Sequence, residues 1–357
     1  MNFTEANHID RVFPLEKTEH ARRLHRNSTI DPEIRRILIC RPNHRLGNLL
    51  LITPLIQELA ETFPECEIDL FVRGHVAPEL FKNYQNIGEI IKLPKRAFPN
   101  VIEYAGSWMA IMKRKYDLVI DVDKGSSSGR LSLQLANGRH KISGDMLENL
   151  KSEFIDYEHH AKFPIYNFRN YLARHGFTKR RGPVPSVNLK LNAWEIAAGR
   201  KLLRQMVQNE KKTICLFTYA TGNKCYSELW WTNFYNRLRY EFPAANIIEV
   251  LPVQNISKLA GKAPTFYSKD VREIGSLIAN TDVFIGADSG IMHLANAVQT
   301  PTVGLFSVSN QKLYAPYGNN SVAIDTNVGN TDECIHVVRQ ILYYRFIQQG
   351  DLKIITA

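Results

Sequence analysis

The segment 283–306 constrains the fold of this chain more than any other stretch, because it reads as strand, turn, helix and strand in succession. Residues 283–285 are apolar and mostly β-branched, which is typical of a strand buried on both faces. Polar residues then interrupt the run, an apolar helical stretch follows at 291–298, and a second strand ends at Phe306. This order predicts an α/β crossover whose polar residues gather at the turn.

The turn of this crossover carries candidate binding residues. Asp288 and Ser289 can accept hydrogen bonds from the free amides of the helix, and Gly290 lets the backbone approach a ligand closely. The amino end of a helix has unpaired N–H groups and a partial positive charge, which suits a phosphate. His293 lies within the first turn. An ordinary helix cap beside a core histidine would use the same residue types, so the rest of the chain must decide.

Length and composition indicate a globular protein of two domains. A chain of 357 residues is too long for one small core, and 44% hydrophobic with 22% charged residues are ordinary globular values. The net charge of +10 favours anionic partners, such as nucleotide sugars, phosphorylated glycolipids, an acidic membrane surface or nucleic acid. The 5 cysteines are scattered and form no C-x-x-C pair, so neither a disulfide framework nor a zinc site is expected.

The amino terminus has no signal-peptide pattern, and no run of about 18 or more apolar residues occurs. We therefore expect a cytoplasmic protein whose contact with a membrane is peripheral. Residues 1–34 are polar and mixed in charge, and they are expected to form an extension before the first domain.

The first domain begins like a mononucleotide-binding fold, with strand, loop, helix and parallel strand in order. Its expected elements are strands at 37–40, 67–73, 89–93 and 118–121, helices at 48–62 and 101–115, and polar loops at 41–47 and 123–130. The second loop follows a strand, and the carboxyl ends of strands are where open α/β sheets bind ligands.

The second domain repeats this pattern after a break rich in basic residues, glycine and proline at 179–192. Its expected elements are strands at 213–217 and 246–250, a loop at 218–224 and a helix at 228–240. The pair Phe63-Pro64 recurs as Phe242-Pro243 at the same distance from the next strand, which suggests two similar Rossmann-like halves.

The string Asp-Ser-Gly-x-x-His at 288–293, with Leu-Ala-x-Ala, the strand ending at Phe306 and Tyr-Ala-Pro-Tyr-Gly at 314–318, resembles the carboxy-terminal signature of glycosyltransferase family 9. These are the heptosyltransferases of lipopolysaccharide core assembly. The resemblance covers roughly residues 36–345. It implies the GT-B architecture, in which two Rossmann-like domains face each other across a cleft.

The resemblance also implies a division of labour between the domains. The expected segments are a polar extension at 1–34, an acceptor domain at 35–182, a linker at 183–194, a nucleotide-sugar donor domain at 195–330, and a last helical segment at 331–357 that packs back toward the first domain. The implied reaction is transfer of a heptose or related sugar from an ADP-sugar to the lipopolysaccharide inner core, with inversion. No metal-ligand cluster stands out in the sequence, so we expect turnover without a metal. No further cofactor is expected.

On the donor side, Lys224 followed by Glu228 and Trp231 resembles the family's Lys-x-Trp-Pro-x-x-x-Trp segment, although Tyr226 and Ser227 stand in place of Trp-Pro. The resemblance implies that Lys224 neutralises the donor diphosphate, with Thr221 nearby. Asp288 would face sugar or ribose hydroxyls, and the residues Ser289, Gly290 and His293 would donate to the phosphates. Trp230 and Trp231 are expected to pack the helix rather than stack on a base.

On the acceptor side, the segment 41–54 resembles the family's Leu-Gly-Asp-x-Leu-x-Thr-x-Pro segment, in which the Asp is held to be the general base. Asn48 stands at that place here, and an amide cannot act as a base near neutral pH. Three explanations stay open: another base such as His44, Asp121 or Asp123 serves, the acceptor arrives activated with Asn48 orienting it, or transfer is slow or lost. We favour a working transferase with a substitute base.

The remaining expectations concern partners. Arg73, Lys124 and Arg130 lie at or after the ends of first-domain strands and are candidate contacts for an anionic glycolipid acceptor. A position at the inner face of the cytoplasmic membrane follows from such an acceptor. One rival is a nucleotide-sugar-binding homologue that has lost the chemistry and regulates or scaffolds. A nucleic-acid-binding protein is the other rival, and it is disfavoured because the basic residues are dispersed.

Overall fold

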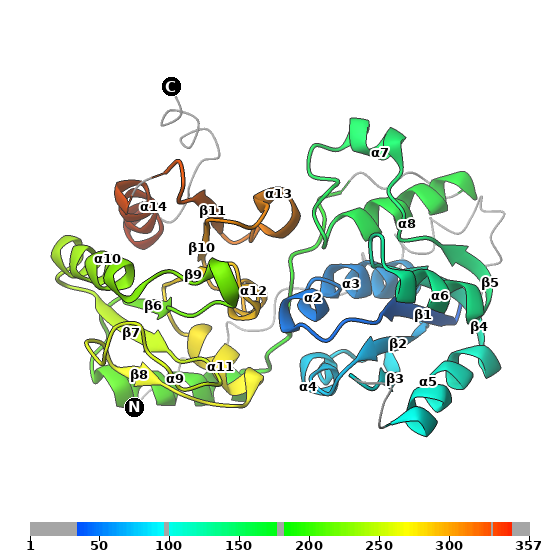
Figure 1. Ribbon diagram of the computed structural model, residues 1–357, viewed down its shortest axis with the longest axis horizontal. Coiled ribbons are helices and arrows are strands. Elements are labelled where there is room, and N and C mark those ends of the chain that lie inside the picture. The colour runs from blue at the N-terminus through cyan, green and yellow to red at the C-terminus, as the bar shows by residue number, and fades with distance from the viewer. Residues whose placement is uncertain (1–33, 96–99, 177–181, 330, 345–357) are drawn as a thin grey trace, which may run out of the picture.

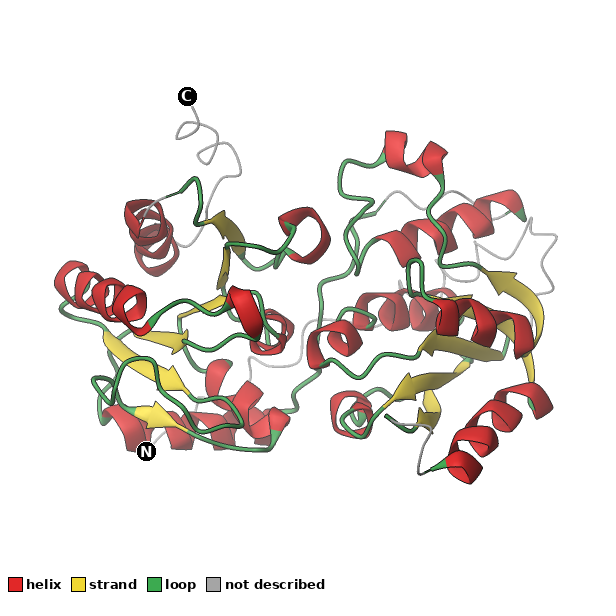
Figure 2. Ribbon diagram, viewed as in Figure 1, coloured by secondary structure: helices red, strands yellow, loops and turns green. Residues whose placement is uncertain are grey.

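The computed structural model describes residues 34–95, 100–176, 182–329 and 331–344 (Figure 1). The extension expected at 1–34 therefore lies, except for its last residue, outside the described residues. The described chain forms two α/β domains side by side, each a central sheet with helices packed around it (Figure 2). In the described part of the chain, none of the helices has the length and apolar character needed to cross a membrane.

The amino-terminal domain is a 5-stranded parallel sheet of order β3-β2-β1-β4-β5. Its strands are β1 (Arg36–Arg41), β2 (Glu67–Arg73), β3 (Ile87–Leu93), β4 (Lys115–Asp121) and β5 (Asn137–Ile142). Its helices are α2 (Leu46–Leu50), α3 (Thr53–Thr62), α4 (Ala77–Phe81), α5 (Val101–Lys113), α6 (Ser127–Leu135), α7 (Glu148–Glu153) and α8 (Phe163–Arg174). The strand order reverses at β1, and ligands of such sheets bind at the carboxyl ends of the strands next to this point.

The carboxy-terminal domain is a 6-stranded parallel sheet of order β11-β10-β9-β6-β7-β8. Its strands are β6 (Thr213–Phe217), β7 (Asn246–Val250), β8 (Thr265–Phe266), β9 (Val283–Ala287), β10 (Thr302–Phe306) and β11 (Val322–Asp325). Its helices are α9 (Ala193–Val207), η1 (Gly222–Lys224), α10 (Glu228–Glu241), α11 (Val271–Ile278), α12 (Gly290–Ala297), α13 (Gln311–Tyr314) and α14 (Thr331–Tyr344). Two Rossmann-like domains, as in the GT-B architecture, are thus confirmed.

One apolar core runs through both domains and holds them together. It contains Ile39 and Leu49 of the amino-terminal domain together with Phe217, Ile274 and Leu294 of the carboxy-terminal domain. Helix α2 packs on α12, and α4 packs on α11. The two domains are therefore held together by burial of apolar surface as well as by the linker.

Two sequence predictions need correction in the amino-terminal domain. The helix expected at 48–62 is two helices, α2 and α3, because Pro54 lies in the first turn of α3, where its missing N–H and fixed φ favour a new helix start. The loop expected at 123–130 is shorter than predicted. Ser126 caps α6 by accepting a hydrogen bond from the Gly129 N–H at 3.1 Å, so Arg130 lies on a helix.

The last helix was expected to pack back toward the first domain, and within the described residues this is wrong. Helix α14 packs on α10 and on strands β9, β10 and β11 of its own domain. Its apolar residues Ile335 and Val338 join the cluster of Trp231 and Phe234 from α10, where they complete one face of the sheet. Residues 345–357 lie outside the described part.

A buried arginine ties the linker to both domains. Arg272 of α11 donates to both carboxylate oxygens of Glu195, at 2.5 and 2.9 Å, and to the backbone carbonyl of Glu79 in the amino-terminal domain at 3.0 Å. Glu195 also closes the capping box of α9 with Asn192, so this helix begins at Ala193, inside the expected linker. The arrangement sets the start of α9 against α4 and α11.

Arg272→Met is expected to lower the free energy of unfolding by about 3 kcal/mol, because it leaves a carboxylate and several carbonyls without their buried cation. Urea unfolding followed by circular dichroism measures the effect. Arg200→Met, an exposed arginine on the same helix as Glu195, is the matched control and should leave stability nearly unchanged. Equal stability of the two variants would show that the pair does not hold the linker.

Candidate active site

A cavity of about 570 Å³ lies between the two domains. It is lined by the loop after β1 and by α2 from one domain, and by the loops after β6, β7 and β9 from the other. The predicted site residues on its wall are His44, Asn48, Thr221, Lys224, Asp288, Ser289, Gly290 and His293. Residues far apart in the sequence are therefore gathered at the carboxyl ends of both sheets, where this fold places ligands.

The start of α12 forms the floor of the carboxy-terminal half. Ser289 is its N-cap and accepts a hydrogen bond from the Met292 N–H at 3.2 Å. No described residue accepts a hydrogen bond from the N–H of Gly290 or Ile291. A Cβ at Gly290 would lie 3.0 Å from the Cβ of Leu46, so glycine allows the close approach of α2. The result is a pair of free amides with the positive end of a helix behind them, which suits an anionic group.

Lys224 lies opposite this helix start and is paired with Asp288. The ammonium Nζ donates to Asp288 Oδ2 at 2.5 Å, and Asp288 is only 5% exposed. The short helix η1 places the lysine, and Gly222 turns the chain into it with a φ of 62°. The Lys224 side chain is about one third exposed, at 34%. A ligand that enters the cavity can therefore reach the ammonium without unfolding the loop.

His293 stands behind the pair. Its Nε2 lies 3.7 Å from Asp288 Oδ1, and the ring is buried. Burial lowers the pKa of His293 well below its usual value, although Asp288 opposes the shift. The ring is thus neutral near pH 7. A Cβ at Gly47 of α2 would lie 2.5 Å from Cδ2 of this ring, so glycine at this position is what lets α2 pack on the histidine.

His44 and Asn48 bring the amino-terminal domain into the same cavity. His44 is exposed, and neither side chain has a hydrogen-bond partner among the described residues. Partial burial lowers the pKa of His44, and the positive charges of Lys95 and Arg45 lower it further. His44 is therefore unprotonated at neutral pH, as a general base must be.

The two aspartates considered as alternative bases do not line this cavity. Asp123 accepts a hydrogen bond from Nη1 of Arg41 at 3.0 Å, in an ion pair with a buried guanidinium. Asp121 is buried, and burial raises the pKa of its carboxyl to about 7. Its Oδ1 accepts from the Asp123 N–H, while Oδ2 has no partner in the described structure. Among the three candidates, His44 alone is placed on the wall of the cavity.

The three predicted acceptor contacts also lie off the cavity wall. Arg73 ends β2, and its charge helps to lower the pKa of His44. Lys124 follows β4, and its charge acts on His160. Arg130 is exposed on α6. Their role as acceptor contacts stays a prediction.

Several residues of the site were not predicted. Tyr314 lines the cavity, with its ring 5.9 Å from Lys224 Nζ and 4.7 Å from the His160 ring of the other domain. Tyr314 belongs to the Tyr-Ala-Pro-Tyr motif, but the local sequence does not indicate which of these side chains faces the cavity. The apolar part of the wall comes from strand ends and α11, namely Phe217, Leu251, Pro252, Val253 and Ile274. Trp231, by contrast, is buried in the helix-packing cluster, as predicted.

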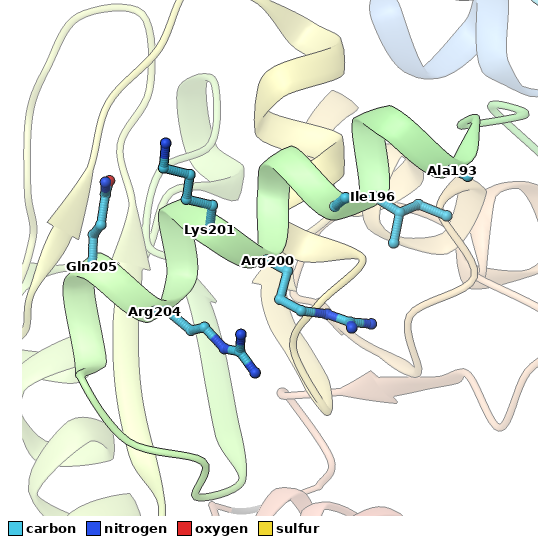
Figure 3. Close-up of a pocket in the computed structure, with 7 residues that line it drawn as sticks. Ala193, Ile196, Arg200, Lys201, Arg204 and Gln205 are labelled. Carbon is cyan, nitrogen blue, oxygen red and sulfur yellow. The ribbon is translucent and has the colours of Figure 1, made fainter. Parts of the chain in front are cut away.

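A second hollow of about 730 Å³ runs along the outside of α9 (Figure 3). Figure 3 shows Arg200 and Arg204 pointing to one side of the helix and Lys201 to another. Apart from these basic residues the described wall is Ala193, Ile196, Ala197 and Gln205. No predicted site residue lies there, so the cavity between the domains is the candidate active site.

The fold and the position of this cavity define the class: two Rossmann-like domains with a ligand-sized cavity between them form the GT-B architecture of glycosyltransferases. A family 9 glycosyltransferase structure from Veillonella parvula superposes with a TM-score of 0.67 at 15% identity, covering 90% of this chain and 92% of that one. The Escherichia coli heptosyltransferase WaaC with ADP gives 0.62 at 17% identity, covering 86% and 99%. At these identities the likeness establishes the fold.

Comparison of sequences shows similarity to the same class of proteins. Residues 256–340 match the model described as glycosyltransferase family 9 (heptosyltransferase). Lipopolysaccharide heptosyltransferase 3 of Escherichia coli is 24% identical over 77% of this chain and 85% of its own length. The lipopolysaccharide core heptosyltransferase OpsX of Haemophilus influenzae is 21% identical over 77% and 80%. These matches support the resemblance to glycosyltransferase family 9 that the sequence motifs implied.

Proposed function

We propose that this protein transfers a heptose or a related sugar from an ADP-sugar to an anionic inner-core acceptor of lipopolysaccharide. The observation that carries the proposal is the cavity itself. It sets the ammonium of Lys224 and the free amides of α12 against His44 and Asn48 of the other domain. A cation and amides suit a diphosphate leaving group, and a neutral imidazole suits a base. The relatives named as heptosyltransferases support the choice of sugar.

In this proposal the donor is held by the carboxy-terminal domain. The diphosphate binds at the amides of Gly290 and Ile291, and Lys224 turns toward it from Asp288. Asp288 is then free to accept hydrogen bonds from a diol of the sugar or ribose. The apolar wall that includes Leu251 and Val253 receives the nucleoside.

The chemical step is a single displacement. An acceptor hydroxyl oxygen attacks the anomeric carbon from the side opposite the diphosphate, and its proton passes to the ring of His44. The bond from the anomeric carbon to the diphosphate oxygen breaks, and its electron pair leaves with the nucleoside diphosphate. One glycosidic bond forms and the configuration inverts. Lys224 and the α12 amides stabilise the charge that grows on the leaving group.

The experiment that tests this function is a donor panel. Purified protein is titrated by calorimetry with ADP-, UDP- and GDP-sugars. It is then incubated with each donor and a truncated inner-core glycolipid, and the masses of the products are measured by mass spectrometry. We expect one ADP-sugar to bind and the acceptor to gain the mass of one sugar. Binding of none of these donors would refute the proposal.

Asn48 favours one alternative, a homologue that binds a nucleotide sugar but no longer transfers it. Such a protein would bind the donor in the same titration. It would release no nucleoside diphosphate when the acceptor is added, whereas a transferase would release one for each sugar moved. The two functions are thus separated in a single sample.

Transfer is expected to proceed without a metal ion, because Lys224 and the α12 amides supply the positive charge that a diphosphate needs. Among the described residues, no group of three or more His, Cys, Asp or Glu side chains is placed to hold one. We predict the same turnover with and without a chelator. Loss of activity in EDTA with recovery on addition of a divalent ion would contradict this.

We also place the enzyme at the inner face of the cytoplasmic membrane, in peripheral contact with it, since a glycolipid acceptor would be held there. Arg73, Lys124 and Arg130 remain the proposed contacts for its anionic groups. Neutralising them in pairs should raise KM for the acceptor and leave donor affinity unchanged. A change in donor affinity instead would assign these residues to another role.

A further inference from the structure

The outward face of α5 is apolar, which is the reverse of the usual pattern for a surface helix. Ile102 is 90% exposed, Val101 53%, Met109 48% and Met112 45%. The opposite side of the same helix is buried, with Ser107 and Ile111 inside and Trp108 packed on the sheet. Helix α5 therefore has apolar residues on both sides, and the outer set makes no contribution to the core.

Helix α6 extends this face. It lies against α5 (Figure 1), and both helices cover the same side of the amino-terminal sheet. Leu131 is 43% exposed and Leu135 37%. We call the exposed apolar residues of the two helices the α5–α6 face. Single exposed apolar residues are ordinary, but six on two adjoining helices form a patch of the kind that marks an interaction surface.

Positive charge borders the α5–α6 face. Lys113 ends α5, Lys115 begins β4, and Arg130 lies on α6, all three exposed. None of the three is in an ion pair with a described residue. Glu103 is the one acidic residue of the two helices. A surface with apolar side chains in the middle and unpaired cations at its border matches an anionic lipid bilayer, whose headgroups are negative and whose interior accepts apolar groups.

We propose that the α5–α6 face docks this protein on an anionic lipid surface. The proposal rests on the proposed function, because it says which surface meets the membrane that holds the acceptor. The face belongs to the amino-terminal domain, and α6 begins shortly after Asp123 and Lys124, which follow the end of β4. Docking there sets the acceptor edge of the sheet close to the headgroups, while the donor domain stays open to soluble nucleotide sugar.

The outside of α9 is the competing surface and supplies the control. It carries Arg200, Lys201 and Arg204, and Trp194 is 85% exposed. Its exposed apolar residues do not form a continuous stripe beside the charges, and α9 belongs to the donor domain. Charge alone would make both surfaces bind vesicles, whereas apolar insertion favours the α5–α6 face.

The test is co-sedimentation of the full chain with vesicles of phosphatidylcholine, or of phosphatidylcholine and phosphatidylglycerol in equal parts. The variants are I102E/M109E, K113E/K115E and, as the control on α9, R200E/K201E. All change exposed side chains, and thermal melting checks that each is folded. We expect wild type and the α9 variant to bind the anionic vesicles. The vesicle affinity of I102E/M109E should be at least about tenfold lower than that of wild type. The affinity of K113E/K115E should fall to the value that wild type shows at high salt, where electrostatic attraction is screened.

Vesicle binding by I102E/M109E equal to that of wild type would overturn the proposal, as would loss of binding only in R200E/K201E. Absence of binding by wild type would overturn it too. Wild-type dimers that dissociate in I102E/M109E, seen by analytical ultracentrifugation, would assign the face to a second copy of the chain. Transfer to a lipid-free acceptor saccharide is measured in parallel. If neither wild type nor any variant transfers sugar to the lipid-free acceptor, the proposed function is refuted. If I102E/M109E loses transfer only to the vesicle-embedded acceptor, the docking face is supported.

Discussion

Lys224→Met is expected to lower kcat/KM by about two to three orders of magnitude, the loss typical of removing one donor to a developing oxyanion. Lys224 contributes the cation of the donor half, and the α12 amides contribute only partial charges. The variant keeps a side chain of similar length and removes the charge. Steady-state release of nucleoside diphosphate measures the effect, and calorimetry with ADP measures the loss of ground-state binding.

Lys269→Met, an exposed lysine of the same domain outside the cavity, is the matched control and should behave as wild type. Asp288→Asn distinguishes two explanations. If Lys224 acts on the diphosphate, Asp288→Asn frees it from its 2.5 Å ion pair, and the amide oxygen can still accept from a ribose hydroxyl, so ADP affinity falls far less than in Lys224→Met. If the pair is only structural, both variants lose stability and neither changes ADP affinity in the folded protein.

The crossover β9–α12–β10 could be predicted from sequence because every signal in it is local. A buried β-branched run, a capping serine and an apolar helix each depend on neighbours within a few residues. The structure places Ser289 as the N-cap and begins α12 at Gly290, within one residue of the expected start. The donor half of the site follows from this one segment, since its free amides come with the helix.

Contacts across the cleft could not be predicted in the same way. The Lys224–Asp288 pair joins side chains 64 residues apart, and the packing of Gly47 on His293 joins different domains. Helix α14 shows the same difficulty, because its apolar stripe fitted either domain and only the aromatic face of α10 decided between them. The choice among His44, Asp121 and Asp123 as the base likewise depends on which strand ends face the cavity. That is a property of the whole sheet and cannot be seen in the local sequence.

His44→Gln is expected to lower turnover by at least roughly a hundredfold, the low end for loss of a general base. His44 lines the cavity, and its pKa lies below the usual histidine value because of partial burial and the nearby cations of Lys95 and Arg45. A base works in its unprotonated form. The wild-type profile of kcat/KM should therefore be flat through neutral pH and fall as the pH drops through the lowered pKa of His44.

The comparison with other bases makes this assignment testable. His75→Gln changes an exposed histidine outside the cavity wall and should leave the profile unchanged. Asp121→Asn and Asp123→Asn should cost less than His44→Gln, because neither carboxylate lines the cavity. If none of the three lowers turnover by about a hundredfold, the substitute-base hypothesis fails.

Asn48→Asp in the His44→Gln background gives the sharpest result. It puts a carboxylate at the position where the family has its aspartate, on the same wall of the same cavity. We expect turnover to recover, with the acid limb of the pH profile moved toward an aspartate pKa of about 4. Recovery with that shift would show that a base at position 48 and a base at position 44 can serve the same proton transfer. If turnover does not recover, a carboxylate at position 48 cannot take over the proton transfer that is assigned to His44.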